Sequence, residues 1–226
     1  MLAQGSAVER LREQVLSGST SVIDAVSALM DTPVRSEVES RAEEFRVLRS
    51  SDPLTLFGEL CFCIITANTS AELGLRMQRL VPKEFFAFSS YDALVSRMHS
   101  HHCRFYRTRS QYIYRARWVL PLLPAIVNER DRFYAREFMV ANVDGLGYKE
   151  ASHFLRNVGV FDFAILDKHV LRLVSREIDV SAFRAGSAKS YLAVERELAG
   201  MASQIGLEPG IFDLYLWKIA TGRVLK

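Results

Sequence analysis

The most informative stretch of the chain is Val143-Asp144-Gly145-Leu146-Gly147-Tyr148-Lys149-Glu150. It is a short turn between two segments that have the periodicity of amphipathic helices. The first helix is predicted to end near Ala141 and the second to begin at Lys149. Gly145 and Gly147 permit positive φ angles and close backbone approach. Their amides and the start of the next helix form a site suited to a phosphate, although a plain turn between two helices is the alternative.

This stretch is not a dinucleotide-binding motif, because Glu150 stands in place of the third glycine and no strand precedes it. Lys149 lies at the start of a predicted helix, where the helix dipole and partial burial disfavour the charged ammonium and make the amine a better nucleophile. Asp167 follows 18 residues later, directly before another amphipathic segment, and can face Lys149 across a cleft. The alternatives are a solvated lysine and a carboxylate that only caps a helix.

Helical periodicity extends along most of the chain. An apolar segment that begins at Asp52-Pro53 has the residue types of an N-cap and first turn, and is expected to be central and buried. Pro121 and Pro124 are predicted to break the chain between two later helices. Because no alternating strand pattern is present, the sequence predicts an all-α fold of about ten helices.

Composition excludes several classes of protein. The chain has 226 residues, a net charge of +3 and 49% hydrophobic residues, which is typical of a globular protein and not of a disordered one. The longest uncharged run, Leu60–Ala71, is shorter than the roughly 20 residues that a membrane-spanning helix needs. Glu9 and Glu13 lie where a signal peptide requires an apolar core, so we expect a cytoplasmic protein with no membrane contact.

Cysteine and histidine residues do not predict a metal site. His99, His101, His102 and Cys103 have no second ligand cluster, and a polar loop is the simpler interpretation. Cys61 and Cys63 point to different faces of a predicted helix. The chain has three cysteines and no run of four, which excludes an iron–sulfur cluster and a disulfide framework.

The most basic stretch runs from His101 to Trp118 and holds five arginines and five aromatic residues but no acidic residue. Arginine beside aromatic rings suits a phosphate backbone and unstacked bases. The alternative is an exposed helix face whose aromatic side chains point into the core.

The run from Gly145 to Asn157, followed by Asp167-Lys168-His169-Val170-Leu171, resembles the helix–hairpin–helix DNA glycosylase superfamily. It is most similar to the 8-oxoguanine DNA glycosylase/AP lyases of the second type, and the chain's last segment, 213–226, shares this similarity. The resemblance implies two helical subdomains with the active site in the cleft between them. One comprises about residues 41–165, with the hairpin at 143–148; the other comprises about 166–226 with the helices of the 1–40 extension.

The resemblance also implies a bifunctional repair enzyme that flips 8-oxoguanine out of double-stranded DNA. The Lys149 amine attacks C1′ and displaces the base, and the Schiff base then allows strand cleavage by β-elimination. Asp167 stabilises positive charge at the sugar. No cofactor is implied apart from a possible monovalent cation at the hairpin, and we expect a monomer associated with the nucleoid of a prokaryote.

Further residues receive DNA-binding roles from the same resemblance. Asn68 bonds to the orphaned cytosine, with a helix C-cap or Asx turn as the alternative. Phe105 and Trp217 stack on the extruded base, unless they pack in the core. Asp213 accepts a hydrogen bond from the base, and Lys226 reaches the base pocket, with a disordered end as the alternative.

Two other functional classes stay open at this point. A glycosylase/lyase for another oxidised base also requires Lys149. A non-catalytic helix–hairpin–helix DNA-binding protein requires neither Lys149 nor Asp167.

Overall fold

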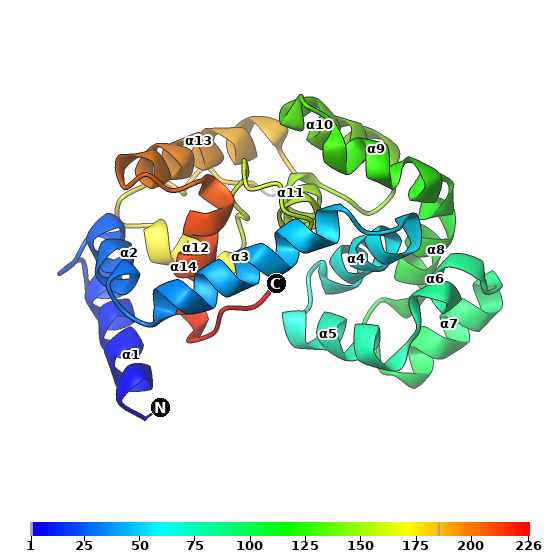
Figure 1. The fold of residues 1–226 in the computed structure, drawn as a ribbon, viewed down its shortest axis with the longest axis horizontal. Helices are drawn as coiled ribbons and strands as arrows, with labels where there is room; N and C mark the ends of the chain where they lie inside the picture. Colours follow the sequence, from blue (N-terminus) through cyan, green and yellow to red (C-terminus); the bar gives the residue numbers. More distant parts are fainter. Residues whose placement is uncertain (1, 185) are drawn as a thin grey trace. The chain divides into compact units, whose positions relative to one another are not determined.

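The computed structural model describes residues 2–184 and 186–226, which form fourteen α-helices, one 3-10 helix and no strand (Figure 1). The all-α prediction is confirmed. The helices outnumber the predicted ten because short ones, such as α6 (Lys83–Phe88) and α9 (Leu123–Asn128), contain too few residues for a periodic pattern. None of the described helices is long and apolar enough to span a membrane.

The chain divides into two compact units. Unit 1 comprises Met1–Glu44 and Val160–Lys226, and unit 2 comprises Phe45–Gly159. The boundaries between the units follow residues 44 and 159, whereas the family resemblance implies boundaries near residues 41 and 165.

Unit 2 is built around α4 (Pro53–Thr66), whose buried residues are Leu56, Phe57 and Glu59 through Thr66. Asp52 caps this helix, because its Oδ1 accepts hydrogen bonds from the backbone N–H groups of Leu54 (2.9 Å) and Thr55 (3.0 Å). The capped, central helix predicted from the sequence is therefore confirmed. The helices packed against it are α5 (Ala71–Leu80), α6, α8 (Tyr106–Ala116), η1 (Arg117–Leu122), α9 and α11 (Tyr148–Asn157).

The two remaining helices of unit 2 pack on members of this group. Helix α7 (Tyr91–Ser100) packs against α8, and α10 (Arg132–Asn142) packs against α11. The predicted break between two longer helices is confirmed, because α8 ends at Ala116 and α10 begins at Arg132, but the prolines between them do not lie in a loop. Pro121 lies inside η1 and Pro124 lies in the first turn of α9, where a missing backbone N–H leaves no helical hydrogen bond unmade.

Unit 1 is built around α14 (Pro209–Thr221), whose residues Phe212 through Leu216 are all buried. It packs against α1 (Leu2–Ser17), α2 (Val22–Met30), α12 (Lys168–Val174) and α13 (Ala188–Gln204). The long helix α3 (Val34–Arg49) follows α2 in the chain, and its Glu37 forms an ion pair with Lys218 of α14 at 2.7 Å. The N-terminal helices thus belong to the same unit as the C-terminal third of the chain.

Packing around α4 generates the first prediction. A Cβ at Gly74 on α5 would lie 2.6 Å from Cε2 of Phe62 and would also overlap the Thr66 methyl. Overpacking costs about 1–3 kcal/mol and exceeds the helix-propensity gain of at most about 1 kcal/mol, so Gly74→Ala is expected to lower the free energy of unfolding. Gly200 on α13 has open space, and Gly200→Ala is expected to raise that free energy by about 0.5–1 kcal/mol. Urea denaturation measures the free energy of unfolding of both variants, and equal values for Gly74→Ala and Gly200→Ala would contradict the packing argument.

Candidate functional site

Helices α10 and α11 are joined by a turn in which only one glycine has the left-handed conformation. Gly145 has φ +85°, and a Cβ there would overlap the ring of Tyr112 from α8. Gly147 has φ −93° and is the N-cap residue of α11, so it does not use the positive φ that glycine permits. A Cβ at Gly147 would lie 3.5 Å from Oε2 of Glu150, an ordinary contact. The sequence does not distinguish the two glycines, because the difference depends on where α11 begins.

Polar contacts between α10 and α11 fix the geometry of this hairpin. Arg136 is fully buried, and its Nη1 donates a hydrogen bond to Oγ of Ser152 at 3.1 Å. The hydroxyl of Tyr148 donates to Oε2 of Glu137 at 2.7 Å. The roles of Arg136, Ser152, Tyr148 and Glu137 were not predicted from the sequence. The feature that could have indicated them is the presence of polar side chains on helix faces that are otherwise predicted to be apolar.

Lys149 lies in the first turn of α11, as predicted to within one residue. Its side chain is 25% exposed, and its Nζ lies 3.6 Å from Oε1 of Glu150. The amine is therefore partly shielded and lies at the positive end of a helix. Glu150 itself also faces a pocket in unit 2.

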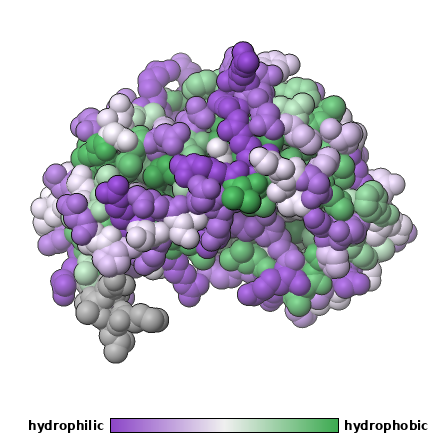
Figure 2. Space-filling model, in the orientation of Figure 1, coloured by the Kyte–Doolittle hydropathy of each residue, from purple (hydrophilic) through white to green (hydrophobic). Residues whose placement is uncertain are grey.

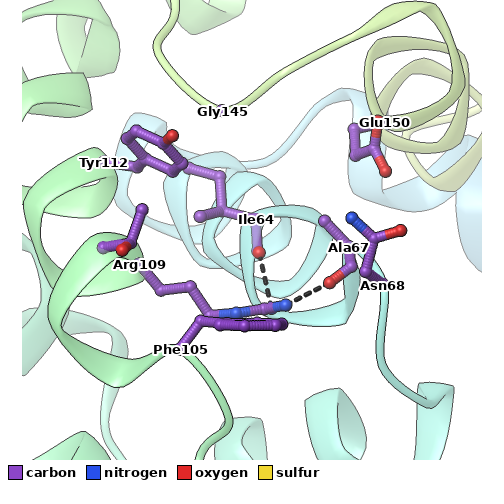
Figure 3. Close-up of a pocket in the computed structure, with 9 residues that line it drawn as sticks. Ile64, Ala67, Asn68, Phe105, Arg109, Tyr112, Gly145 and Glu150 are labelled. Carbon is purple, nitrogen blue, oxygen red and sulfur yellow. Dashed lines mark hydrogen bonds between the residues drawn. The ribbon is translucent and has the colours of Figure 1, made fainter. Parts of the chain in front are cut away.

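This pocket has a volume of about 310 Å³ and contains, besides Gly145 of the hairpin, the predicted DNA contacts Asn68 and Phe105 (Figure 3). Both have positive φ angles, 53° and 58°, which are uncommon outside glycine. Phe105 is 51% exposed, so the core-packing alternative is wrong for this residue. The other lining residues are Ile64, Ala67, Thr108, Arg109, Tyr112, Gly145 and Glu150.

Arg109 fixes the wall of the pocket. Its guanidinium donates to the backbone oxygen of Ile64 at 2.9 Å and to that of Ala67, at the end of α4 (Figure 3). Only 4% of the residue is exposed, and burial is the main cause that lowers the pKa of Arg109 below its ordinary value. The loop that carries Asn68 is thereby held at its first residue.

The basic stretch presents several of its aromatic residues to solvent. Phe105, Tyr114 and Trp118 are 46–51% exposed, and the Arg117 guanidinium lies 4.6 Å from the ring centroid of Tyr114. The alternative that these aromatic rings fill the core is wrong for all three. On the face drawn in Figure 2, hydrophobic residues lie among hydrophilic ones over the helices of unit 2.

Asp167 belongs to unit 1 and caps α12. Its Oδ1 accepts hydrogen bonds from the backbone N–H groups of His169 and Val170, both at 2.8 Å. The capping role weighed in the sequence analysis is therefore confirmed. Lys149 belongs to unit 2, and the predicted approach of the two side chains stays a prediction.

The predicted base contacts at the C-terminal end differ in their surroundings within unit 1. Asp213 is 2% exposed, and its Oδ1 accepts a hydrogen bond from the backbone N–H of Ile165 at 3.1 Å. Trp217, one turn later on α14, is partly exposed, and its ring packs edge-on against His169 with centroids 5.2 Å apart. Lys226 is half-buried. Contacts of these three residues with a base stay predictions.

Within residues 2–184 and 186–226, no group of three or more His, Cys, Asp or Glu side chains is arranged to hold a metal ion. His99 instead packs against the ring of Tyr106, with centroids 4.7 Å apart. Cys61, Cys63 and Cys103 are all buried free thiols.

An all-α chain with a glycine turn between two helices and a lysine in the first turn of the second is the arrangement of the helix–hairpin–helix DNA glycosylases. A model of the family described as 8-oxoguanine DNA glycosylase matches residues 38–207. The chain belongs to this family, and the resemblance found in the sequence is confirmed.

Individual relatives agree with this assignment. An 8-oxoguanine DNA glycosylase/AP lyase of Picrophilus torridus is 48% identical over 84% of this chain and 90% of its own. The crystal structure of the Methanocaldococcus jannaschii 8-oxoguanine glycosylase/lyase, in complex with a 15mer DNA containing 8-oxoguanine, is 35% identical with a TM-score of 0.86. That match covers 92% of this chain and 100% of the other. The 8-oxoguanine DNA glycosylase of Thermotoga maritima is 40% identical, with a TM-score of 0.84 over 95% and 100%.

The two hairpin glycines generate the second prediction. Gly145→Ala is expected to destabilise the fold and to weaken DNA binding, because alanine is strained at φ +85° and overlaps Tyr112. Gly147→Ala is expected to leave the free energy of unfolding unchanged within about 0.5 kcal/mol, since its backbone suits any residue. It should weaken binding to lesion and undamaged duplexes by the same factor, because a hairpin that contacts the backbone carries no base information. Fluorescence anisotropy with both duplexes measures this, and a loss confined to lesion DNA would contradict the assignment.

Proposed function

We propose that this protein excises 8-oxoguanine from double-stranded DNA and then cleaves the strand at the resulting abasic site. The observation that carries the proposal is the glycine turn followed by Lys149 in the first turn of α11, in a chain that belongs to this family. The names of the relatives support it: they are 8-oxoguanine DNA glycosylase/AP lyases, and one was crystallised with DNA containing 8-oxoguanine.

In the proposed reaction, the neutral amine of Lys149 donates its lone pair to C1′ of the flipped nucleotide. The bond from C1′ to the base breaks, the electron pair leaves with the base, and the base takes up a proton. Loss of a proton from the new C–N linkage and opening of the sugar ring give a Schiff base. Removal of a proton from C2′ leaves its electron pair to form a C2′–C3′ double bond, which breaks the C3′–O bond, expels the 3′ phosphate and nicks the strand.

Asp167 supplies the negative charge that this chemistry needs. Positive charge develops at the sugar as the bond to the base breaks, and a fixed carboxylate stabilises it without reorganisation. The two capping hydrogen bonds, both to Oδ1, hold the Asp167 carboxylate in one orientation. Capping and charge stabilisation are therefore compatible roles for one side chain.

The remaining site residues are proposed to bind DNA. Gly145 and Gly147 present backbone amides to a phosphate. Asn68 bonds to the base left opposite the lesion, which its exposed position on the pocket loop allows. Phe105 and Trp217 stack on the extruded base, and its polar edge is bound by Asp213 and Lys226.

The proposed chemistry uses an amine and a carboxylate from the chain itself, so we propose no cofactor and leave open only a monovalent cation bound by carbonyl oxygens of the hairpin. We further propose that the protein acts as a monomer on chromosomal DNA in the cytoplasm of a prokaryote, where its proposed substrate lies.

Reductive trapping tests the nucleophile. Borohydride reduces a Schiff base to a stable covalent adduct, so wild-type protein is expected to be trapped on a duplex with 8-oxoguanine and not on one with thymine glycol. Lys149→Gln is expected to abolish trapping and base excision while the dissociation constant for lesion DNA changes less than about threefold, because Gln keeps most of the side-chain volume.

The matched control is Lys168→Gln, which removes an exposed lysine beside Asp167 and should leave trapping unchanged. Trapping that survives in Lys149→Gln would place the nucleophile elsewhere. Trapping on thymine glycol alone would favour a glycosylase for oxidised pyrimidines, and no adduct with any lesion would favour a non-catalytic DNA-binding protein.

Lys226 generates a separate prediction about specificity. Its ammonium only donates hydrogen bonds, so it distinguishes bases by their acceptors. Lys226→Ala is expected to reduce the ratio of excision rates for 8-oxoguanine and guanine by roughly tenfold or more, because the loss of one specific hydrogen bond removes discrimination. The melting temperature should stay unchanged. Lys189→Ala, which removes an exposed lysine of α13, is the control, and equal discrimination in both variants would remove Lys226 from the base pocket.

A further inference from the structure

The chain reaches Asp167 through a buried segment that has no regular secondary structure. Residues 160–167 form neither helix nor strand, yet Phe163, Ala164, Ile165 and Leu166 are at most 6% exposed. Buried backbone N–H and C=O groups must find hydrogen-bond partners, and this segment has no neighbouring strand to supply them. Side chains supply several of its partners.

Two buried side chains supply these partners, one from α13 and one from α14. Tyr191 of α13 is fully buried; its hydroxyl donates to the backbone oxygen of Ala164 (3.2 Å) and accepts from the backbone N–H of Leu166 (3.3 Å). Asp213 of α14 accepts from the backbone N–H of Ile165, which lies between these two residues. Three consecutive residues are thus each held through one backbone group.

The held residues lead directly to the proposed charge stabiliser. The backbone N–H of Asp167 donates to the oxygen of Ile165 at 2.9 Å, which makes a tight turn before α12 begins at Lys168. Farther back in the segment, the N–H of Gly210 donates to the oxygen of Phe161 at 2.8 Å. The segment is therefore anchored at both ends, and the position of Asp167 depends on the backbone immediately before it.

We infer that Tyr191, together with Asp213, is a positioning residue that holds Asp167 in place for the reaction at the sugar. The inference rests on the proposed function, since it requires that Asp167 acts on the reacting nucleotide. A displacement of about 1 Å in a catalytic group can cost roughly a hundredfold in rate. The Tyr191 hydroxyl, which contacts the residue immediately before Asp167, is the group whose loss would allow such a displacement.

This inference changes the interpretation of Asp213. Its carboxylate is predicted from the sequence to bind the base, but in unit 1 one of its oxygens accepts a hydrogen bond from the backbone N–H of Ile165. A buried carboxylate that accepts a backbone N–H fixes that segment whether or not its other oxygen meets a base. Tyr191, to which no base contact has been given, therefore offers the cleaner test.

The test is Tyr191→Phe, which removes the hydroxyl and keeps the ring that packs against Phe183. Single-turnover excision of 8-oxoguanine is expected to slow roughly tenfold to a hundredfold. The dissociation constant for the lesion duplex is expected to stay within twofold of the wild-type value, because the substitution shifts one carboxylate and removes no DNA contact. A purely structural role would instead lower stability and leave the rate of the folded protein unchanged.

Tyr215→Phe is the matched control. Tyr215 is also buried in unit 1, at 2% exposure, but the charged groups that act on its hydroxyl are Glu39 and Arg35 of α3. The same loss of a hydroxyl should leave the excision rate within twofold of wild type. If Tyr191→Phe folds poorly, the same substitution in the Gly200→Ala background, measured against Gly200→Ala alone, restores a folded sample.

A double-mutant cycle with Asp167→Asn decides whether Tyr191 acts through Asp167. Asparagine caps a helix as well as aspartate, so this variant keeps α12 and loses only the charge. In the Asp167→Asn background, Tyr191→Phe is expected to cause no further slowing beyond twofold. Additive effects would overturn the positioning role alone, whereas wild-type rates in Asp167→Asn would overturn the proposed role of Asp167 itself.

Discussion

Buried backbone outside helices needs hydrogen-bond partners, and both candidate site segments of this protein are fixed by side chains that meet this need. In unit 2, the guanidinium of Arg109 binds the last carbonyl groups of α4 and so holds the loop that carries Asn68. In unit 1, Tyr191 and Asp213 bind the irregular segment before Asp167. A helical protein thus gains rigid non-helical segments where side chains must be presented in fixed positions. Buried side-chain hydrogen bonds of this kind to backbone favour one backbone conformation.

The hairpin and the pocket of unit 2 are physically coupled through Tyr112. Its ring packs on the Cα of Gly145, the residue with a left-handed conformation, and also lines the pocket that contains Asn68 and Phe105. A change in the hairpin therefore moves a pocket wall, because close-packed interiors transmit displacement. The proposed phosphate contact at the hairpin and the proposed base contacts at the pocket consequently belong to one packed unit.

Much of the fold follows from local pattern. The apolar run after Asp52-Pro53 predicted the central helix α4 with its cap, because capping chemistry and burial on all sides are both visible in residue order. The turn at Gly145 and the lysine after it were also visible. The short helices and the 3-10 helix at Pro121 were not, since one or two turns have no measurable period.

By itself, the sequence determined the all-α class, the hairpin between two helices, the family and the candidate nucleophile, because each depends on residues close together in the chain. Tertiary structure alone decided which glycine needs a positive φ, that Phe105 is exposed, and that Arg109, Tyr191 and Asp213 serve buried backbone. The hydrogen bonds of Arg109, Tyr191 and Asp213 to backbone join residues 25 to 48 positions apart, as between Leu166 and Tyr191 or Ile165 and Asp213. A local sequence pattern does not predict such partners, because a side chain can form a hydrogen bond with any backbone group that lies close to it in space and has a free donor or acceptor.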